Sequence, residues 1–268
     1  AFAEQTILEC KTRVIAVERP GYGLSSYDPN RAIIDWPNDI AQLADALGLE
    51  QFSLLGVSAG GVYALACAHA LGERIYRTGI AGTLAPVHDT DELKHMSLVS
   101  RTAFKLMGRD SRRARWIVGR LLGTLIRHYP TQVVKGLNLG LCNNDRVALN
   151  DENFSREFTK SIREAYEQGY HGPFHDISLV TKPWGFEPEA IRGPVYLWHG
   201  QQDSVVPDSM GRHLSERLAN CHSHYPAEEG HFSIITNYMQ QALKTLSAEQ
   251  GGAQQQIKEQ EHDPEVIA

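Results

Sequence analysis

The sequence has few cysteines, no long apolar run and little excess charge, and each shortage excludes a class of protein. No apolar run reaches the roughly 18 residues that a transmembrane helix needs, so no membrane span is expected. The formal charge of −6 disfavours nucleic acid as a partner. No Cys-x-x-Cys pair occurs, which indicates free thiols, a reducing compartment and a cytoplasmic protein. The four cysteines are Cys10, Cys67, Cys142 and Cys221.

Metal-binding patterns are also scarce. Among the histidines, only His171 and His175 have His-x3-His spacing. Gly172 and Pro173 between them interrupt the helix that would aim both rings in one direction. The sequence therefore predicts no metal site and no cofactor. Its 42% hydrophobic and 22% charged residues are typical of an ordinary soluble globular protein.

What the sequence does contain is a serine between glycines, at the junction of a strand pattern and a helix pattern. Gly-Val-Ser-Ala-Gly at 56–60 follows the apolar run 52–55 and precedes the helix-compatible run 61–68. A sharp strand-to-helix turn of this kind places the Ser58 hydroxyl above the sheet, facing a substrate. Glycine suits both ends of the motif because a Cβ there would collide with the neighbouring strand and helix. The motif alone is a weak signal, and the partners that a serine needs must come from elsewhere.

Two later segments supply those partners. Asp203 lies in the loop after the β-rich run 194–198, and the carboxyl ends of strands are where open α/β sheets place ligands. His231 lies on the loop after a last short strand predicted at 223–226. The chain order Ser58, Asp203, His231 is one of the three common orders of a serine triad.

Four motifs in this order resemble the α/β-hydrolase superfamily, in its cap-bearing group of esterase-, peptidase- and lipase-like enzymes. With their flanking elements they span residues 13 to about 240. The resemblance implies an α/β-hydrolase fold: a mostly parallel sheet flanked by helices, with a helical cap inserted before the penultimate strand. The motifs are Arg-Pro-Gly-Tyr-Gly-Leu-Ser at 19–25, Gly-Val-Ser-Ala-Gly-Gly at 56–61, His-Gly-Gln-Gln-Asp-Ser-Val-Val-Pro at 199–207 and Glu-Gly-His-Phe at 229–232.

The domain organisation follows from where strand patterns give way to helical spacing. We expect a hydrolase core at 1–87 and 192–247, with a helical cap at 88–191. Residues 248–268 have almost nothing to bury, so they are expected to form a disordered tail. The predicted strands are 13–18, 52–56, 75–81, 194–198 and 223–226, and helices are predicted at 35–47 and 233–246.

Chemistry and resemblance together assign a role to each residue. Ser58 is the expected nucleophile, and His231 is the base that activates it and later protonates the leaving group. Asp203 would hold the imidazole tautomer, and the backbone N–H of Ala59 would donate to the oxyanion. In some relatives the acid follows the sixth strand, where Asp89 and Asp91 stand here, but Asp203 is favoured.

The predicted function is that of a serine hydrolase cleaving an ester, amide or related bond of a small molecule through an acyl-enzyme. A serine at the turn disfavours dehalogenase and epoxide hydrolase chemistry, in which a carboxylate attacks. Carbon–carbon bond hydrolysis, cleavage at a peptide terminus and acyl transfer remain open because the same triad performs them. Trp184 and Phe186 are candidates either to line a substrate pocket or to pack between cap and core.

The resemblance also predicts that one central strand of the family's sheet is missing from this chain. The strand at 13–18 corresponds to the fourth of the family's sheet, and residues 1–9 to the end of its first helix. About fifty residues of a typical relative would then lie before Ala1, an extent consistent with usual domain sizes. They include the third strand, between the fourth and fifth, and the loop that donates to the oxyanion. A catalytically impaired fragment or a non-catalytic binding module is therefore the alternative function.

Overall fold

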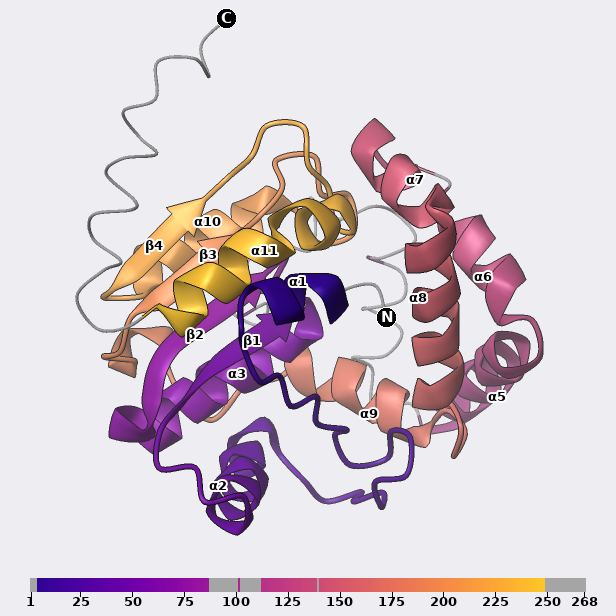
Figure 1. Cartoon of the computed structure of the whole chain (residues 1–268). Coiled ribbons are helices and arrows are strands. Elements are labelled where there is room, and N and C mark those ends of the chain that lie inside the picture. The colour runs from indigo at the N-terminus through magenta and orange to yellow at the C-terminus, as the bar shows by residue number, and fades with distance from the viewer. Residues whose placement is uncertain (1–3, 87–100, 102–111, 139, 249–268) are drawn as a thin grey trace, which may run out of the picture.

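The centre of the computed structural model, which describes residues 4–86, 101, 112–138 and 140–248, is a four-stranded sheet (Figure 1). All neighbouring strands are parallel, so their carboxyl ends meet at one edge of the sheet. Loops that leave this edge are therefore brought together from distant parts of the chain. The strands, in their order across the sheet, are β1 (Phe52–Val57), β2 (Ile75–Ala81), β3 (Val195–Trp198) and β4 (Cys221–His224).

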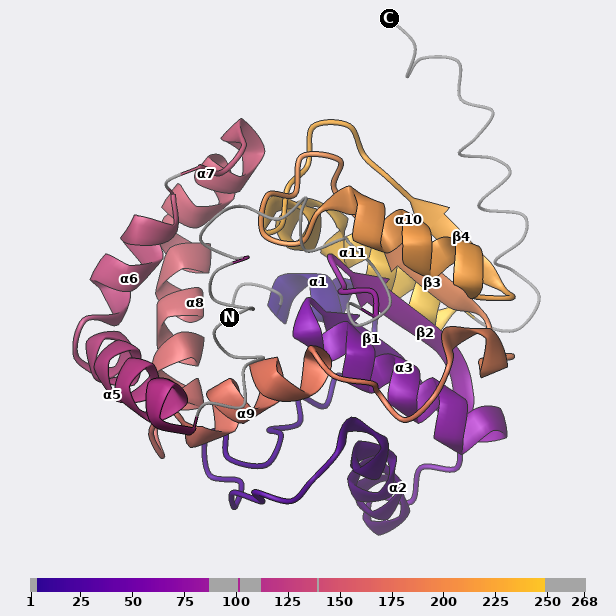
Figure 2. The ribbon, with the colours of Figure 1, turned by 180° about the vertical axis from the view of Figure 1, so that it is seen from behind.

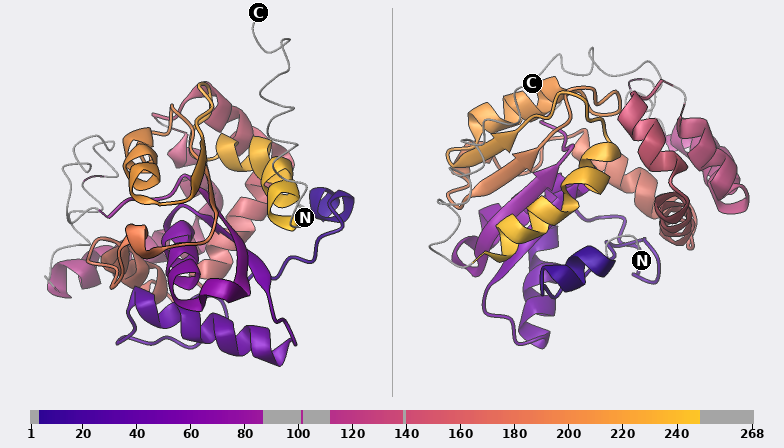
Figure 3. Two further views of the ribbon diagram at one scale, coloured as in Figure 1. Left: turned by 90° about the vertical axis from the view of Figure 1, so that its left-hand side faces the viewer. Right: turned by 45° about the horizontal axis from the view of Figure 1, so that its top comes forward.

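Helices cover both faces of the sheet (Figures 1 and 3). On one face α3 (Ala59–Leu71) packs against β1 and β2, with α2 (Trp36–Ala46) beside it and α10 (Asp208–Arg217) near β4. On the other face lies α11 (Ser233–Ser247), which the short α1 (Glu4–Glu9) contacts. Single turns of 3-10 helix occur at η1 (Ile33–Asp35), η2 (Gly72–Arg74) and η4 (Pro188–Ala190).

Strand β3 shows why the sheet needs both layers. Its residues are all buried, and alternate side chains point to opposite faces. Leu197 belongs to the core shared with α3 and α10, whereas Tyr196 and Trp198 pack against α11 residues such as Leu246. Burying a side chain of this size stabilises the fold by about 1.5–3 kcal/mol. A strand that is apolar at every position is thus stable only between two helical layers.

In the part of the chain that the structure describes, five α-helices lie between β2 and β3 and form a group beside the sheet (Figures 1 and 2). We call this segment, residues 112–180, the insert. Part of it has a separate small apolar core that includes Val134, Leu149 and Phe154. Its last helix contacts α3, and α7 contacts α11. The helices are α5 (Arg112–His128), α6 (Pro130–Leu137), α7 (Asn143–Asn150), α8 (Glu152–Ala165) and α9 (His171–Val180).

The strand predicted at 13–18 is wrong. Residues 12–19 carry no regular structure, and the side chain of Val14 is 49% exposed. A cavity of about 1320 Å³ separates this segment from β1, so its backbone has no strand to pair with. The cavity lies on the side of β1 where the resemblance predicts a gap. Among the described residues, Ser58, Asp203 and His231 do not line it.

The other predicted elements are present, with small shifts at their ends. Pro37 lies in the first turn of α2, and Gly48 with φ 66° follows its end, as expected for a helix start and stop. The last strand begins and ends two residues earlier than predicted, at Cys221 and His224. Most of the predicted tail and residues 88–100 and 102–111 of the predicted cap, with Asp89 and Asp91, lie outside the described residues.

Candidate active site

Ser58 lies at a sharp turn between β1 and α3. Its backbone has φ 53° and ψ −127°, a conformation that residues with a side chain rarely adopt. The turn is held because Ser58 N–H donates to Ala81 O at 2.8 Å and Gly61 N–H donates to Ser58 O at 3.0 Å. Strain of this kind persists only where the surroundings enforce it, and it is common at functional sites.

Two glycines allow this turn, and they are not quite the pair that the motif suggests. A Cβ on Gly56 would lie 2.5 Å from Gly60 O, so the strand and helix could not approach each other. A Cβ on Gly61 would lie 2.0 Å from Thr83 Oγ1. At Gly60 the nearest atom would be Arg19 Nη1 at 3.9 Å. The predicted collision is therefore confirmed at Gly56 and wrong at Gly60.

Asp203 and His231 form a buried hydrogen-bonded pair. His231 Nδ1 lies 2.7 Å from Asp203 Oδ2, and the other carboxylate oxygen accepts the backbone N–H groups of Val205 and Val206, both at 2.8 Å. An ionised carboxylate only accepts hydrogen bonds, so Nδ1 carries the proton. The lone pair of His231 is thereby placed on Nε2, the nitrogen that would face a nucleophile.

The electrostatics of this pair favour the charged imidazole. Burial alone would lower the pKa of His231, but the adjacent Asp203 carboxylate outweighs burial and raises this pKa above its ordinary value. The carboxylate of Asp145, on α7, acts on this pKa in the same direction. The ring is thus a stronger base than a free histidine.

The end of β2 connects Ser58 to this pair. Gly82 follows Ala81, the residue that accepts from Ser58, and has φ 53°. A Cβ on Gly82 would lie 3.1 Å from His231 Nδ1 and 3.3 Å from Asp203 Oδ2. Ser58 and the pair therefore flank the same short stretch of backbone. No hydrogen bond of the described residues joins the Ser58 hydroxyl to His231.

Sequence reasoning missed two residues that lie beside the His231–Asp203 pair, Gly82 and His199. The His199 ring is completely buried, its Nε2 donates to Val206 O at 2.8 Å, and the same nitrogen lies 3.6 Å from Asp203 Oδ2. Burial lowers the pKa of His199, which keeps the ring neutral. Its position directly before the Asp203 loop is the signal that could have indicated a supporting role.

Ala59 is the first residue of α3. The first N–H groups of a helix have no acceptor within the helix, so this N–H is available to a ligand above the turn. The positive end of the helix dipole adds to its attraction for an anion. The position fits the predicted oxyanion donor.

Trp184 and Phe186 lie in the main hydrophobic core, next to each other. Trp184 is 2% exposed and donates its indole N–H to Val180 O, and the Phe186 ring stacks on His69 at 5.3 Å. His69 is near the end of α3, about 16 Å along the helix from Ser58 at 1.5 Å per residue. This placement supports the packing alternative for both residues.

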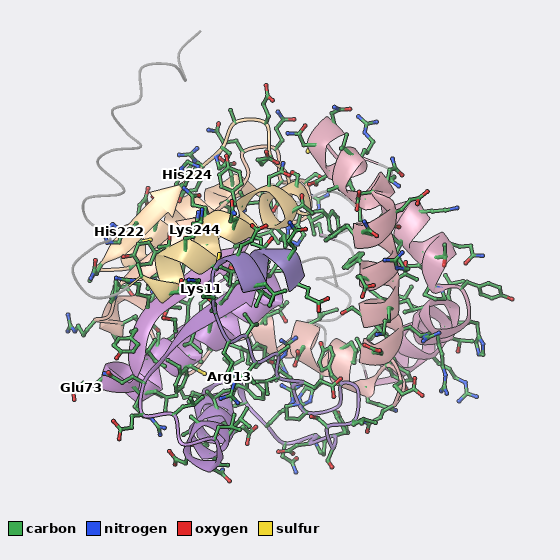
Figure 4. The ribbon with its side chains drawn as sticks, viewed as in Figure 1. Lys11, Arg13, Glu73, His222, His224 and Lys244 are labelled. Atoms are coloured by element: carbon green, nitrogen blue, oxygen red, sulfur yellow. The ribbon has the colours of Figure 1, made fainter. Side chains whose placement is uncertain are left out.

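Other histidines lie away from the candidate site. His222 and His224 are exposed on β4, on the side of the sheet remote from the insert (Figure 4). They stack or tilt against the rings of Tyr196 and Tyr238. Within the described part of the chain, no group of three His, Cys, Asp or Glu side chains could hold a metal ion. Nor is any helix of that part long and apolar enough to cross a membrane.

The fold and site together define an open parallel α/β protein with a serine-bearing turn beside a buried histidine–aspartate pair. Residues 3–240 match the model described as the alpha/beta hydrolase family, and the chain belongs to that family. The predicted superfamily and fold class are thereby confirmed.

Individual relatives are distant. A curated 2-hydroxymuconate semialdehyde hydrolase of Pseudomonas putida is 23% identical over 233 residues, which cover 83% of this chain and 72% of the relative. The solved esterase EaEST from Exiguobacterium antarcticum has a TM-score of 0.65 and 19% identity, covering 91% of this chain and 85% of its own. A bromoperoxidase from Bacillus anthracis has a TM-score of 0.63 and 20% identity, over 90% and 83% of the two chains.

Proposed function

We propose that the protein is a serine hydrolase that cleaves an ester, amide or related bond of a small molecule through an acyl-enzyme. The observation that supports it most is the buried hydrogen bond of 2.7 Å between His231 and Asp203 at the sheet edge where the Ser58 turn lies. A serine hydroxyl is a weak nucleophile at neutral pH and needs such a base beside it.

In the proposed reaction, Ser58 Oγ attacks the carbonyl carbon while His231 Nε2 takes its proton. Asp203 stabilises the resulting imidazolium, and the N–H of Ala59 donates to the oxyanion. When the tetrahedral intermediate collapses, the imidazolium gives its proton to the leaving group and Ser58 is acylated. A water molecule then attacks the acyl-enzyme, with His231 again as the base. This step releases the carboxylic acid product and restores the Ser58 hydroxyl.

The relatives support this class of reaction. They include esterases among the solved structures, such as the one from Exiguobacterium antarcticum. The curated relative, a 2-hydroxymuconate semialdehyde hydrolase, favours hydrolysis of a semialdehyde as the second candidate function.

The four cysteines are unpaired, which supports a cytoplasmic location.

A chain-length panel of p-nitrophenyl esters tests the proposal. We expect hydrolysis by the protein to fall by on the order of 10³-fold or more in Ser58→Ala, since the nucleophile is removed. The control is Ser26→Ala, a change at an exposed serine, which should leave the rate unchanged. Equal rates for the protein and Ser58→Ala would contradict the proposal, and turnover of 2-hydroxymuconate semialdehyde alone would favour the second candidate.

A further inference from the structure

A buried carboxylate of the insert holds the loop that carries His231. Asp145, on α7, is 0% exposed and forms no ion pair with a lysine or arginine of the described residues. Instead its two oxygens accept three consecutive backbone N–H groups. The donors are His231 at 2.9 Å to Oδ2, and Phe232 at 2.8 Å and Ser233 at 2.9 Å to Oδ1.

This arrangement compensates for the burial of the charge. The helix α11 begins at Ser233, so its first N–H groups have no acceptor of their own and present a partial positive charge. Hydrogen bonds to a charged acceptor are stronger than those between neutral groups, so three of them offset much of the cost of burial. Close approach also needs Gly230, because a Cβ there would lie 2.3 Å from Asp145 Oδ2. The loop is thus shaped around this carboxylate.

An apolar contact fixes the same loop from the insert. Phe232, directly after His231, is buried in the insert's small core with Leu149 and Phe154. Its ring meets the Phe158 ring edge-on at 5.5 Å. The histidine backbone is therefore held by the insert through both a polar and an apolar contact.

Further hydrogen bonds connect the residues before His231 to α7, the helix that carries Asp145. Asn144, the neighbour of Asp145 on α7, donates to Glu229 at 3.4 Å, and Asn237 of α11 donates to the same carboxylate at 3.0 Å. The titratable groups that act on the pKa of the His231 ring are Asp203 and Asp145, and His231 in turn helps to lower the pKa of the neighbouring His199.

We propose that Asp145 is a positioning residue for His231, so that the geometry of catalysis depends on the insert being seated against the core. The proposal rests on the proposed function in one respect, namely that His231 is the base. Asp145 itself contacts no reacting atom. It fixes the backbone from which the imidazole projects, and its charge lies close enough to favour the protonated ring.

The variant Asp145→Asn tests this with little change of size. An amide oxygen can still accept from Phe232 and Ser233, but the NH₂ group then faces the N–H of His231 and the negative charge is lost. We expect kcat for a p-nitrophenyl ester to fall on the order of 10²-fold, since a misplacement of about 1 Å costs that much. KM should change less than about threefold, because the group does not contact substrate.

The matched control is Asp151→Asn. Asp151 is also a carboxylate of the insert and also accepts a backbone N–H at a helix start, that of Phe154 at 2.8 Å, but it does not contact the His231 loop. Because Asp151 is exposed and accepts one N–H rather than three, Asp151→Asn should lose less stability, and its kcat should stay within twofold. An equal loss of kcat in both variants would show a general effect of unfolding and would overturn the proposal.

A second readout does not need turnover. In an NMR titration of the His231 ring, Asp145→Asn should lower the midpoint relative to the unchanged protein, and Asp151→Asn should not. An unmoved midpoint together with an unmoved kcat would overturn the positioning role even if Ser58→Ala is inactive, so the two proposals fail separately. If Asp145→Asn does not melt cooperatively, Phe232→Leu loosens the same loop and should lower kcat with the midpoint unchanged; an unchanged kcat in that variant would equally contradict the proposal.

Discussion

His231 Nδ1 and Asp203 Oδ2 lie 2.7 Å apart, although the two residues belong to loops after different strands. The parallel sheet is what makes this contact possible, because β3 and β4 end at the same edge. The Asp203 loop supplies a buried acceptor, and the His231 loop supplies the base. Neither residue could form the pair without the register of these two strands.

Replacing Asp203 with Asn should remove most activity without removing the fold. The amide can present an N–H to His231 Nδ1, which favours the wrong tautomer and leaves no base toward Ser58. We expect kcat for ester hydrolysis to fall on the order of 10⁴-fold. Steady-state kinetics with p-nitrophenyl esters measure this, and circular dichroism checks that the secondary structure is kept. A variant with a nearly normal kcat would show that the acid is elsewhere.

The raised pKa of His231 predicts the pH profile. The base must be neutral to accept a proton, so activity requires a pH above its pKa. Because Asp203 raises this pKa above the ordinary 6.5, the acidic limb of kcat/KM should have its midpoint above pH 6.5. Stability has the opposite sign: the His231 contribution is present at pH below the ordinary value and is lost as pH rises through the raised pKa. A limb centred below pH 6.5 would contradict this prediction.

Gly56 and Gly136 form a matched pair for testing the turn. Gly56→Ala places a Cβ 2.5 Å from Gly60 O, which forces the strand and helix of the Ser58 turn apart. We expect a loss of about 1–3 kcal/mol in the free energy of unfolding, with reduced activity. Gly136→Ala has open space and lies in α6, so it should stabilise by about 0.4–1 kcal/mol. Urea unfolding measures both, and equal effects would refute the close packing.

Asp176 connects the insert to the core through buried charges. Asp176, on α9, accepts hydrogen bonds from Arg19 Nε at 2.6 Å and from Tyr63 OH at 2.7 Å. It also forms an ion pair with Arg31. Removing it by Asp176→Ala leaves two largely buried guanidinium groups unpaired, so we expect a loss of about 3–5 kcal/mol. The control is the partly exposed Asp208, which pairs with the exposed Arg212, and Asp208→Ala should cost less than about 1 kcal/mol. Similar losses in both variants would contradict this assignment.

The ion pairs of Asp176 also predict how the stability of the protein changes at acidic pH. Burial alone would raise the pKa of Asp176, but Arg19 and Arg31 outweigh it, and the pKa is lowered in the folded protein. A group with a lowered pKa contributes stability above its ordinary value of 3.8, and that contribution is lost as pH falls through the lowered pKa. Urea midpoints between pH 5 and pH 3 should therefore fall more steeply for the unchanged protein than for Asp176→Ala.

How much the sequence could predict depended on how local the signal was. The Ser58 turn and the Asp203 loop could be predicted because each follows an apolar strand. His231 could be predicted only from its place after a short polar strand and from the order of the motifs. Asp145 could not be found in this way. Its partners lie 86–88 positions away, and a single aspartate on a polar helix looks like a surface residue until the packing of α7 on the His231 loop is known.

The prediction of a strand at 13–18 was wrong because a local pattern was present but its partner strand was not. The segment's apolar run, rich in β-branched residues, is typical of a strand, but a strand forms only where a neighbour completes its hydrogen bonds. Pattern alone does not reveal whether that neighbour is present, and here a cavity takes its place. Trp184 and Phe186 were ambiguous because large aromatic side chains are equally suited to a pocket wall and to a core.

The most direct test is to treat the protein with a fluorophosphonate, which phosphonylates an activated serine and releases fluoride, and to map the adduct by peptide mass spectrometry. The central claim predicts one adduct, on the peptide that contains Ser58, and its disappearance in His231→Ala. A folded protein that takes up no reagent, or takes it up on another serine, would contradict the claim.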